Sequence, residues 1–341
     1  MMKALYYKTL ENGVVRCTLC PHYCLIGDNE HGFCNVRINK EGNLYNELFE
    51  KVIAKGLDPI EKKPLYHFYP GSNILSVGSL GCTMKCLFCQ NYRLSQPTPE
   101  DYNETDLLSV SALLDLAKNI RGNIGIAFTY NEPTSFYEYM IHVARGAKPL
   151  GLKTVMVTNG YINREPLESI LPFIDAFNVD LKAFSESFYK TITQSKLEPV
   201  KKTISRIAHA QKHLEITNLV IPGMNDNYSE FEEMVKWIVA ETGDLTVLHI
   251  SRYFPKYQMK IESTPINILL DLYEIAKKHL KYVYLGNMFD ATIDTTFCDS
   301  CNSPLIVREP GKTKITGLDK HGNCTKCGNH LLDDVTYSHH G

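Results

Sequence analysis

The chain has 341 residues, 44% of them hydrophobic, which predicts one large domain with small additions. Its 36 basic and 38 acidic residues leave a net charge of -2, so no overall field favours a polyanion and we expect no nucleic-acid binding. No run approaches the roughly 18 apolar residues of a membrane helix, and the start lacks the apolar stretch of a secretory signal, so we expect no membrane association and a cytoplasmic location. In that setting the 11 cysteines indicate metal or cluster ligands rather than disulfides.

The first cysteine group lies near the N-terminus, with C-x2-C-x3-C-x9-C spacing. Gly27 and Gly32 between these cysteines suit a tight ligand loop. We therefore expect residues 1–70 to form a metal-binding region, with zinc as the first interpretation and a second iron-sulfur cluster as the alternative. The four ligands would be Cys17, Cys20, Cys24 and Cys34.

The second cysteine group is a C-x3-C-x2-C run formed by Cys82, Cys86 and Cys89, with no fourth cysteine nearby. Four thiolates would close a zinc site or an electron-transfer cluster. Three thiolates on a cubane 4Fe-4S cluster instead leave one iron free to bind and activate another molecule. The alternative interpretations are an unrelated loop and an incomplete zinc site.

From about residue 74, short apolar runs alternate with amphipathic helical stretches, a pattern typical of parallel strands joined by crossover helices. We therefore expect residues 71–290 to form an α/β partial barrel. Six strands are predicted at 73–79, 124–129, 153–158, 176–181, 215–221 and 246–251, with a candidate closing strand at 282–285. Helices are predicted at 106–119, 134–150, 165–171, 186–194, 201–213, 228–242 and 266–279.

Polar side chains stand at the carboxyl ends of all six predicted strands, where the loops of a parallel barrel converge on one mouth. Ordinary turn chemistry would not place charged groups there so regularly. Each residue alone has another interpretation: the asparagines as caps or turn formers, Glu132 as a first-turn acid, Lys182 as a solvated side chain and His249 as a core histidine. The candidates are Asn131, Glu132, Thr158, Asn159, Asp180, Lys182 and His249.

The third cysteine group consists of two C-x2-C pairs, Cys298 with Cys301 and Cys324 with Cys327, and indicates the two knuckles of a ribbon. Zinc favours such tetrahedral sulfur cages, and a short tail with little core of its own would need the metal to fold. We expect residues 291–341 to form a zinc-ribbon-like region, with iron or a cluster as the alternative. The two tetrads could also exchange pairs in space, because nearness in sequence does not fix which thiols share a metal.

The spacing of the central triad resembles the signature of the radical S-adenosylmethionine (radical SAM) superfamily. The resemblance implies a 4Fe-4S cluster whose open iron chelates S-adenosylmethionine (SAM). Reductive cleavage of SAM would then give a 5'-deoxyadenosyl radical that abstracts hydrogen from a substrate. The residues at the strand ends resemble those of the activating-enzyme branch, which implies a partial (β/α)6 barrel with cluster and cofactor at its open top.

The same resemblance implies which residues contact SAM. Phe88 matches an aromatic position that borders adenine, and Glu132 with the following proline stands where many members carry Gly-Gly-Glu-Pro, beside the cofactor's amino group. Asp180 and Lys182 match an Asp-x-Lys element of glycyl-radical activating enzymes, where an ammonium suits the cofactor carboxylate. The segment beginning at Val220 resembles one that packs against adenine. The implied cofactor-binding set is Phe88, Asn131, Glu132, Thr158, Asn159, Asp180, Lys182, Val220 and His249.

Over nearly its whole length the chain resembles the radical SAM member of the AmmeMemoRadiSam system, which is often labelled as similar to pyruvate formate-lyase activating enzyme. The resemblance implies a radical SAM oxidoreductase that receives its electron from reduced flavodoxin or ferredoxin. The chain lacks the eight extra cysteines of activating enzymes with ferredoxin inserts. The motifs that carry the resemblance lie at 16–24, 32–37, 58–67, 89–91, 129–134 and 251–255.

The leading functional hypothesis is hydrogen abstraction from a glycine of a partner protein. The alternative is modification of a small molecule or of a different protein, including the Memo-like and AMMECR-like proteins of the system. A remote alternative is a nonenzymatic metal-binding adaptor, which has no evident need for polar groups at six strand ends. A simple electron carrier would close its cluster with a fourth thiolate. No side chain is singled out as catalytic, because the cofactor does the hard chemistry.

Overall fold

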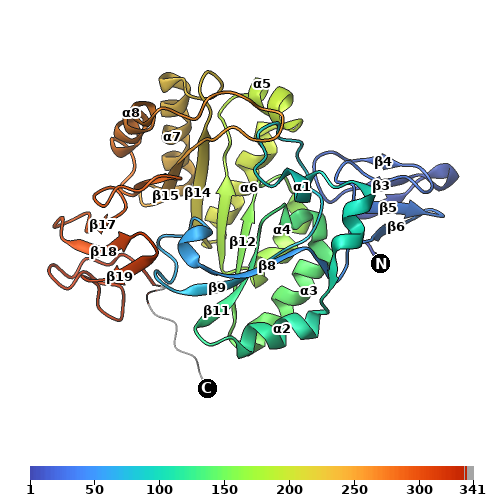
Figure 1. The fold of residues 1–341 in the computed structure, drawn as a ribbon, viewed down its shortest axis with the longest axis horizontal. Coiled ribbons are helices and arrows are strands. Elements are labelled where there is room, and N and C mark those ends of the chain that lie inside the picture. The colour runs from blue at the N-terminus through green and yellow to red at the C-terminus, as the bar shows by residue number, and fades with distance from the viewer. Residues whose placement is uncertain (334, 336–341) are drawn as a thin grey trace.

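A computed structural model of the protein describes residues 1–333 and 335, and an eight-stranded sheet forms its centre (Figure 1). The strand order is β16-β15-β14-β13-β12-β11-β9-β8. All neighbours from β9 to β16 pair in parallel, and β8 pairs antiparallel with β9 at the edge. The strands are β8 (Ala54–Pro59), β9 (Asn73–Gly78), β11 (Asn123–Phe128), β12 (Lys153–Thr158), β13 (Ala176–Asp180), β14 (His213–Val220), β15 (Val247–Arg252) and β16 (Val283–Gly286).

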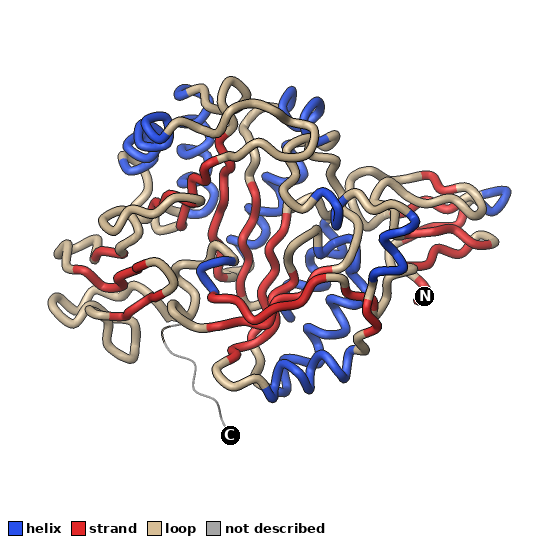
Figure 2. The backbone as a smooth tube through the Cα atoms, in the orientation of Figure 1, coloured by secondary structure: helices blue, strands red, loops and turns tan. Residues whose placement is uncertain are grey.

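Helices connect the parallel strands and lie around the sheet, as Figure 2 shows by colour. Each helix turns an apolar stripe inward. In the helix that precedes β15, the buried residues Phe231, Met234, Val235 and Ile238 recur at helical spacing. The connecting helices are α2 (Val110–Asn119), α3 (Tyr137–Ala147), α4 (Arg164–Ile170), α6 (Leu197–His209), α7 (Tyr228–Thr242) and α8 (Ile266–Lys277).

The predicted α/β class with a central parallel sheet is confirmed, and the candidate strand at 282–285 is present as β16. Most of the helices differ from the predicted bounds by a few residues, and the cause is clear for two of them. The helix expected from residue 106 begins at Val110, because residues 106–107 form strand β10 (Asp106–Leu107), paired with β7 (Lys51–Val52), and Ser109 caps the helix instead. The helix expected at 201–213 is α6, which begins earlier, at Leu197, and ends earlier, at His209, because His213 already begins β14.

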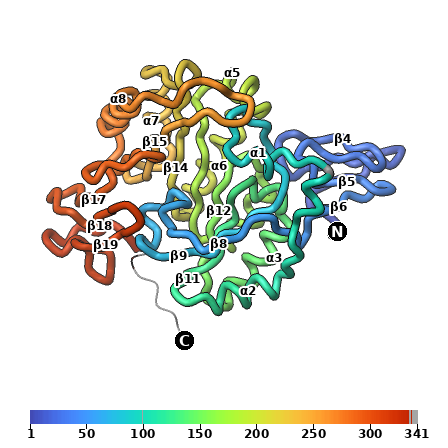
Figure 3. The backbone as a smooth tube through the Cα atoms, in the orientation of Figure 1, coloured from blue at the N-terminus to red at the C-terminus, as the bar shows by residue number. Residues whose placement is uncertain are grey.

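Besides the β7–β10 pair, the described residues form three three-stranded antiparallel sheets outside the central one, and these place the two Cys-rich regions on opposite sides of the barrel (Figures 1 and 3). The region predicted at 1–70 also supplies β8 to the central sheet. The end of the region predicted at 291–341 lies outside the described residues. The N-terminal sheets are β1 (Met2–Lys3), β6 (Asn43–Asn46), β5 (Arg37–Lys40) and β2 (Tyr7–Thr9), β3 (Val15–Cys17), β4 (Leu25–Ile26); the C-terminal sheet is β17 (Thr296–Phe297), β18 (Pro304–Glu309), β19 (Lys312–Ile315).

A buried arginine attaches the C-terminal sheet to the barrel. Arg308 of β18 donates hydrogen bonds to the carbonyl of Tyr66 at 2.6 Å and to the hydroxyl of Thr296 at 2.9 Å. Its guanidinium lies 4.1 Å from the centre of the Tyr66 ring, within the range of a cation–π contact. Among the described residues, no helix has the length and apolar content needed to cross a membrane.

Candidate active site

The loop after β9 carries the central cysteine triad, and backbone hydrogen bonds fix its shape. The amides of Lys85 and Leu87 donate to the carbonyls of Thr193 at 2.9 Å and Ile192 at 3.1 Å. Both carbonyls belong to a π-helical turn, Tyr189–Thr193, a feature often found at functional sites. This turn replaces most of the α-helix expected at 186–194, of which only α5 (Glu186–Phe188) is α-helical.

The three thiols of the triad line one cleft of about 610 Å³ at the carboxyl ends of the parallel strands. This volume lies within the range of about 300–1,000 Å³ that is usual for small-molecule sites. Among the described residues, no fourth cysteine and no histidine lines the cleft. The predicted residues that line it are Cys82, Cys86, Phe88, Cys89, Asn131, Glu132, Thr158, Asn159, Asp180 and Lys182.

An acid–base pair at the end of β13 lies beside the thiols. The Lys182 ammonium is 2.9 Å from a carboxylate oxygen of Asp180 and 5.7 Å from the centre of the Phe88 ring. Burial disfavours the lysine charge, but the nearby Asp180 and Cys86 outweigh it, so the pKa of Lys182 is raised. The lysine is therefore protonated, and it presents a fixed positive charge to an anionic ligand group.

Glu132, which is 1% exposed, links the ends of two neighbouring strands. One carboxylate oxygen accepts hydrogen bonds from the hydroxyls of Thr134 at 2.7 Å and Thr158 at 2.8 Å. The other accepts from the backbone amide of Asn159 at 2.8 Å. Burial raises the pKa of Glu132, and these hydrogen bonds oppose the rise. The carboxylate fixes the ends of β11 and β12 relative to each other.

Two predicted asparagines hold the triad loop. Asn131 accepts a hydrogen bond from the amide of Ser79 at 3.1 Å and donates to the carbonyl of Gly81 at 2.8 Å. The side-chain amide of Asn159 lies 3.1 Å from the Thr83 hydroxyl and 3.5 Å from the Cys82 sulfur. An N–H donor beside a ligating sulfur is one of the means by which proteins tune iron-sulfur clusters.

Two predicted residues lie outside the set that lines the cleft. Val220, at the end of β14, is fully buried, and its carbonyl accepts a hydrogen bond from the Thr264 hydroxyl at 2.6 Å. His249 lies within β15 with its ring nitrogen 2.6 Å from Glu215. The alternative interpretation of His249, a satisfied core histidine, describes this environment.

A polar cluster that was not predicted from the sequence also lies on the lining of the cleft. Asp58 accepts hydrogen bonds from the Lys63 ammonium at 2.9 Å and from the Tyr130 hydroxyl at 2.8 Å. Burial would raise the pKa of Asp58, but these two hydrogen bonds outweigh it and lower the pKa to about 2. Asp58 and Lys63 belong to the sequence motif at 58–67, but this motif precedes the first predicted strand, so the sequence did not place it at the ends of the strands. Only the antiparallel pairing of β8 with β9 brings it to the cleft.

The four C-terminal thiols converge on one point, with all ligand atoms within 4.8 Å of one another. The sulfur of Cys298 lies 3.6 Å from that of Cys327, and the sulfur of Cys301 lies 3.6 Å from that of Cys324. Zinc–sulfur bonds of about 2.3 Å in a tetrahedron place the sulfurs roughly 3.8 Å apart. The geometry fits a single tetrahedral ion. The two pairs meet each other and exchange no partner with the N-terminal tetrad, whose thiols line a separate cavity.

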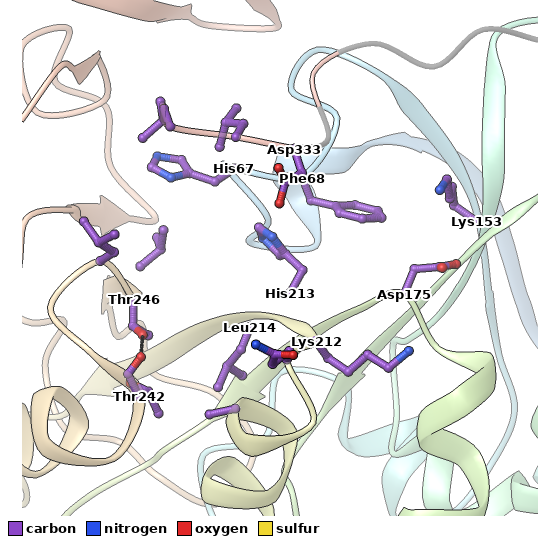
Figure 4. Close-up of a pocket in the computed structure, with 16 residues that line it drawn as sticks. His67, Phe68, Lys153, Asp175, Lys212, His213, Leu214, Thr242, Thr246 and Asp333 are labelled. Atoms are coloured by element: carbon purple, nitrogen blue, oxygen red, sulfur yellow. Dashed lines mark hydrogen bonds between the residues drawn. The ribbon is translucent and has the colours of Figure 1, made fainter. Parts of the chain in front are cut away.

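A second large cavity, of about 520 Å³, lies at the amino ends of the strands (Figure 4). Lys153 and Asp175 lie on one side of it, and His67 and Asp333 lie near the C-terminal region. None of the described residues that line it is a cysteine or a predicted site residue. The first residues of β12, β14 and β15, namely Lys153, His213 and Val247, line it, so the cavity lies at the opposite end of the barrel from the triad.

A carboxylate closes the barrel interior near this second cavity. Glu215 is fully buried and accepts hydrogen bonds from the backbone amides of Tyr66 at 2.9 Å and His67 at 2.7 Å. The ring nitrogens of His213 and His249 lie 3.0 Å and 2.6 Å from its oxygens. Two backbone amides and two imidazole rings thus surround the buried carboxylate of Glu215. They supply the hydrogen bonds that a carboxylate needs when it is removed from water.

The neutral state of His67 makes stability dependent on pH. Burial lowers the pKa of His67 to about 3, whereas an unfolded histidine has a pKa of about 6.5. Between these values the unfolded chain binds more protons, so stability is full above about pH 6.5 and falls as the pH drops toward about 3. We expect the Tm to fall by roughly 5 °C between about pH 7 and pH 5, as followed by circular dichroism. In the His67→Gln variant the Tm should fall less over this pH range. In the control variant His321→Gln, which changes an exposed histidine, the Tm should fall as much as in the wild type. Equal slopes in all three proteins would contradict this account.

Comparison with known proteins identifies the class. The model of the Radical SAM superfamily matches residues 76–238. The uncharacterized protein MJ0808 of Methanocaldococcus jannaschii is 39% identical over 334 residues, which cover 96% of this chain and 98% of that protein. MJ1227 of the same organism, whose full name is "Putative glycyl-radical enzyme activating enzyme MJ1227", is 26% identical over 247 residues, covering 67% of this chain and 93% of its own length.

A solved structure shows the same fold. SuiB of Streptococcus suis bound to S-adenosylmethionine superimposes with a TM-score of 0.50 at 16% identity, covering 63% of this chain and 52% of SuiB. The chain belongs to the radical SAM superfamily. Within it, the chain is similar to the activating enzymes of glycyl-radical enzymes. The 4Fe-4S cluster and SAM that this fold implies fit the cleft, because three thiols without a fourth ligand lie beside a protonated lysine.

Proposed function

We propose that the protein is a radical SAM enzyme in which Cys82, Cys86 and Cys89 hold a 4Fe-4S cluster with one open iron. The observation that carries the proposal is that these thiols line the same cleft as the Asp180–Lys182 pair, with no fourth thiol or imidazole among its described lining residues. When bound there, the cluster and SAM supply a 5'-deoxyadenosyl radical for hydrogen abstraction.

The chain's own residues bind and orient the cofactor in this proposal. The Lys182 ammonium binds the SAM carboxylate, and the Phe88 ring borders the adenine. The side chain of Asn159 lies beside Cys82 and fixes the triad loop. Glu132 uses both oxygens within the protein, so it acts by holding the strand ends in place. Reacting groups held in this way lose little freedom on the path to the transition state.

The Lys182→Met variant is expected to bind SAM about 10- to 100-fold more weakly, since a hydrogen bond to a charged group contributes about 1.5–3 kcal/mol. Anaerobic equilibrium dialysis with labelled SAM measures this directly. The matched control is Lys190→Met, which removes an exposed lysine from the neighbouring π-helical turn. Equal affinity of the wild type and the Lys182→Met variant would rule out the proposed carboxylate contact.

We further propose that the target is a glycine of a partner protein, with the electron delivered by reduced flavodoxin or ferredoxin. The support is the similarity to MJ1227, whose name describes an activating enzyme. A second candidate is modification of a small molecule or of a different protein, such as the Memo-like and AMMECR-like proteins. The absence of the eight extra cysteines of ferredoxin inserts, together with the resemblance to the AmmeMemoRadiSam member, favours this second candidate.

Fractionation of an anaerobic extract of the source cells distinguishes the two candidates. The reconstituted enzyme, SAM and dithionite are combined with either the macromolecular or the low-mass fraction, and 5'-deoxyadenosine is quantified. Stimulation by macromolecules, with a persistent radical signal whose splitting collapses after growth on deuterated glycine, supports the activase. Stimulation by the low-mass fraction, or a protein mass change without a stable radical, supports the second candidate.

We also infer that the C-terminal tetrad binds a structural zinc ion. The sulfur–sulfur distances of 3.6 Å support this inference, because they are close to the spacing that one tetrahedral zinc imposes. The four thiols also occupy all positions of a tetrahedron, which leaves no open site for catalysis. The ion would therefore stabilise the C-terminal sheet.

A further inference from the structure

The four N-terminal thiols lie around one small cavity between the N-terminal sheets and the triad loop. Thr83 of the triad loop belongs to the same lining, so the cavity adjoins the segment that carries the central cysteines. The residues that matter for its chemistry are Cys17, Cys20, Cys24, Cys34 and Arg37.

The spacing of these thiols differs from that of the C-terminal tetrad. Within the described part of the chain, the C-terminal tetrad is the one group of three or more possible ligands whose atoms lie within 4.8 Å of one another. The N-terminal thiols share a cavity without reaching this spacing. A core of several irons and bridging sulfides separates its thiolate ligands more widely than a single zinc ion does. The wider arrangement favours a cluster.

Arg37 gives an independent indication of the occupant. It is 1% exposed, and it donates to the carbonyl of Leu5 at 2.9 Å, to the carboxylate of Glu138, and toward the sulfur of Cys17 at 3.6 Å. Its Nε is buried and has no hydrogen-bond partner among the described residues. A single zinc ion adds no acceptor to the cavity, whereas the bridging sulfides of an iron-sulfur cluster accept hydrogen bonds from such donors.

The loops of the two cysteine groups touch each other. The His22 ring, which lies between Cys20 and Cys24 in sequence, is 2.8 Å from the carbonyl of Thr83. Gly81 packs so closely that a Cβ atom there would lie 2.5 Å from the carbonyl oxygen of Cys34. The N-terminal cavity therefore adjoins the loop that carries the triad.

We propose that Cys17, Cys20, Cys24 and Cys34 hold a second, fully ligated iron-sulfur cluster that passes electrons to the open cluster. The relay rests on the proposed function. A one-electron donor of the flavodoxin or ferredoxin class reduces the N-terminal cluster by one electron, and this electron then moves to the open cluster. No bond forms or breaks, and no proton moves. Electrons enter from outside the cleft, which stays free for SAM and substrate.

Metal analysis of the anaerobically reconstituted full-length chain tests the site without depending on activity. In the Cys82→Ala/Cys86→Ala/Cys89→Ala variant we expect about four irons and four sulfides per chain, with an electron paramagnetic resonance signal on reduction. Adding the Cys17→Ala and Cys20→Ala substitutions to this variant should remove the iron, the sulfide and the resonance signal. Zinc should stay at about one per chain throughout. An iron-free triad variant with about two zinc ions per chain would overturn the proposal.

The Arg37→Lys variant guards against a folding artefact, because it keeps the charge beside Glu138 while removing the planar set of donors. We expect it to retain the iron of the N-terminal cluster and to change the midpoint potential of that cluster, measured by redox titration of its resonance signal in the triad variant. An identical potential would contradict the role of Arg37 as a donor to the cluster.

The relay is tested by the ratio of two rates of 5'-deoxyadenosine formation, one with reduced flavodoxin and one with dithionite. We expect the Cys20→Ala variant to lower this ratio about tenfold, since the protein donor depends on the N-terminal cluster. An unchanged ratio would overturn the relay. If the wild type forms no product with either reductant and also does not bind SAM, the proposed function fails. The iron content of the triad variant still decides whether the second cluster exists.

Discussion

The Cys86→Ala variant is expected to form no 5'-deoxyadenosine from SAM, a loss of at least about a thousandfold. Two thiolates cannot hold a cubane cluster with one open iron. Cys86 is 8% exposed, so solvent is poorly placed to supply a substitute ligand. Chromatography after incubation with SAM and dithionite measures the product.

The control for this variant is Lys85→Gln, which changes the same loop and keeps all three thiols. It should retain product formation, because the amide of Lys85, not its side chain, holds the loop. If the N-terminal cluster exists, total iron in Cys86→Ala should fall by about half, from about eight per chain to about four. Wild-type product levels in Cys86→Ala would contradict the assignment of the triad.

Loss of the zinc ion that we propose for the C-terminal tetrad is expected to unfold the C-terminal sheet. The apolar core of this region is small and consists of Cys298, Leu305, Ile306, Cys324, Leu332 and Val335. Two of these six residues are proposed metal ligands, so we expect the core to depend on the ion. Structural zinc binding contributes roughly 10 kcal/mol in small metal-dependent domains, which exceeds what so few apolar residues supply.

The Cys298→Ala variant tests this expectation through limited proteolysis and zinc analysis. We expect it to contain no C-terminal zinc and to be cleaved rapidly within residues 291–335, while the barrel survives. Lys312→Ala, which changes an exposed position of β19, is the control and should stay resistant. A zinc-free variant that resists protease as well as the wild type would show that the region folds without metal.

Much of the site could be predicted from sequence because parallel strands all bring their carboxyl ends to one edge. The positions of the strands in the sequence are therefore enough to predict that three groups meet at this edge: the cysteine triad after β9, Glu132 after β11, and Asp180 at the end of β13. The bounds of α7 and β12 also match the prediction, since their apolar patterns are bordered by polar turns.

The depth of a residue within a strand and the face on which it lies were harder to infer. His249 is on the barrel's inner face but lies three residues before the end of β15, so it reaches the layer below the cleft and meets Glu215. In β14, Thr217 and Leu219 line the cleft, so the next residue, Val220, points to the other face. Both residues thus lie away from the cleft lining, and this could not be inferred because the sequence defines strand ends only to within a few residues.

The remaining features of the site that the sequence did not predict depend on pairing between segments far apart in the chain. Nothing in the run from Asp58 to Lys63 indicates that it forms the wall of a cleft with Tyr130, because this follows from β8 pairing antiparallel with β9. The closeness of the N-terminal thiols to the triad loop is likewise a property of packing. It depends on contacts such as that between His22 and Thr83, which are 61 residues apart.

The most direct test of the central claim is the amount of 5'-deoxyadenosine formed from SAM by the anaerobically reconstituted, dithionite-reduced protein. The account predicts product that requires SAM, reductant and all three thiols of the triad. The contradicting result would be a wild-type protein that contains a full, reduced cluster at Cys82, Cys86 and Cys89 but does not bind SAM. Such a protein would also form no more product than the Cys86→Ala variant, whether or not cell extract is added.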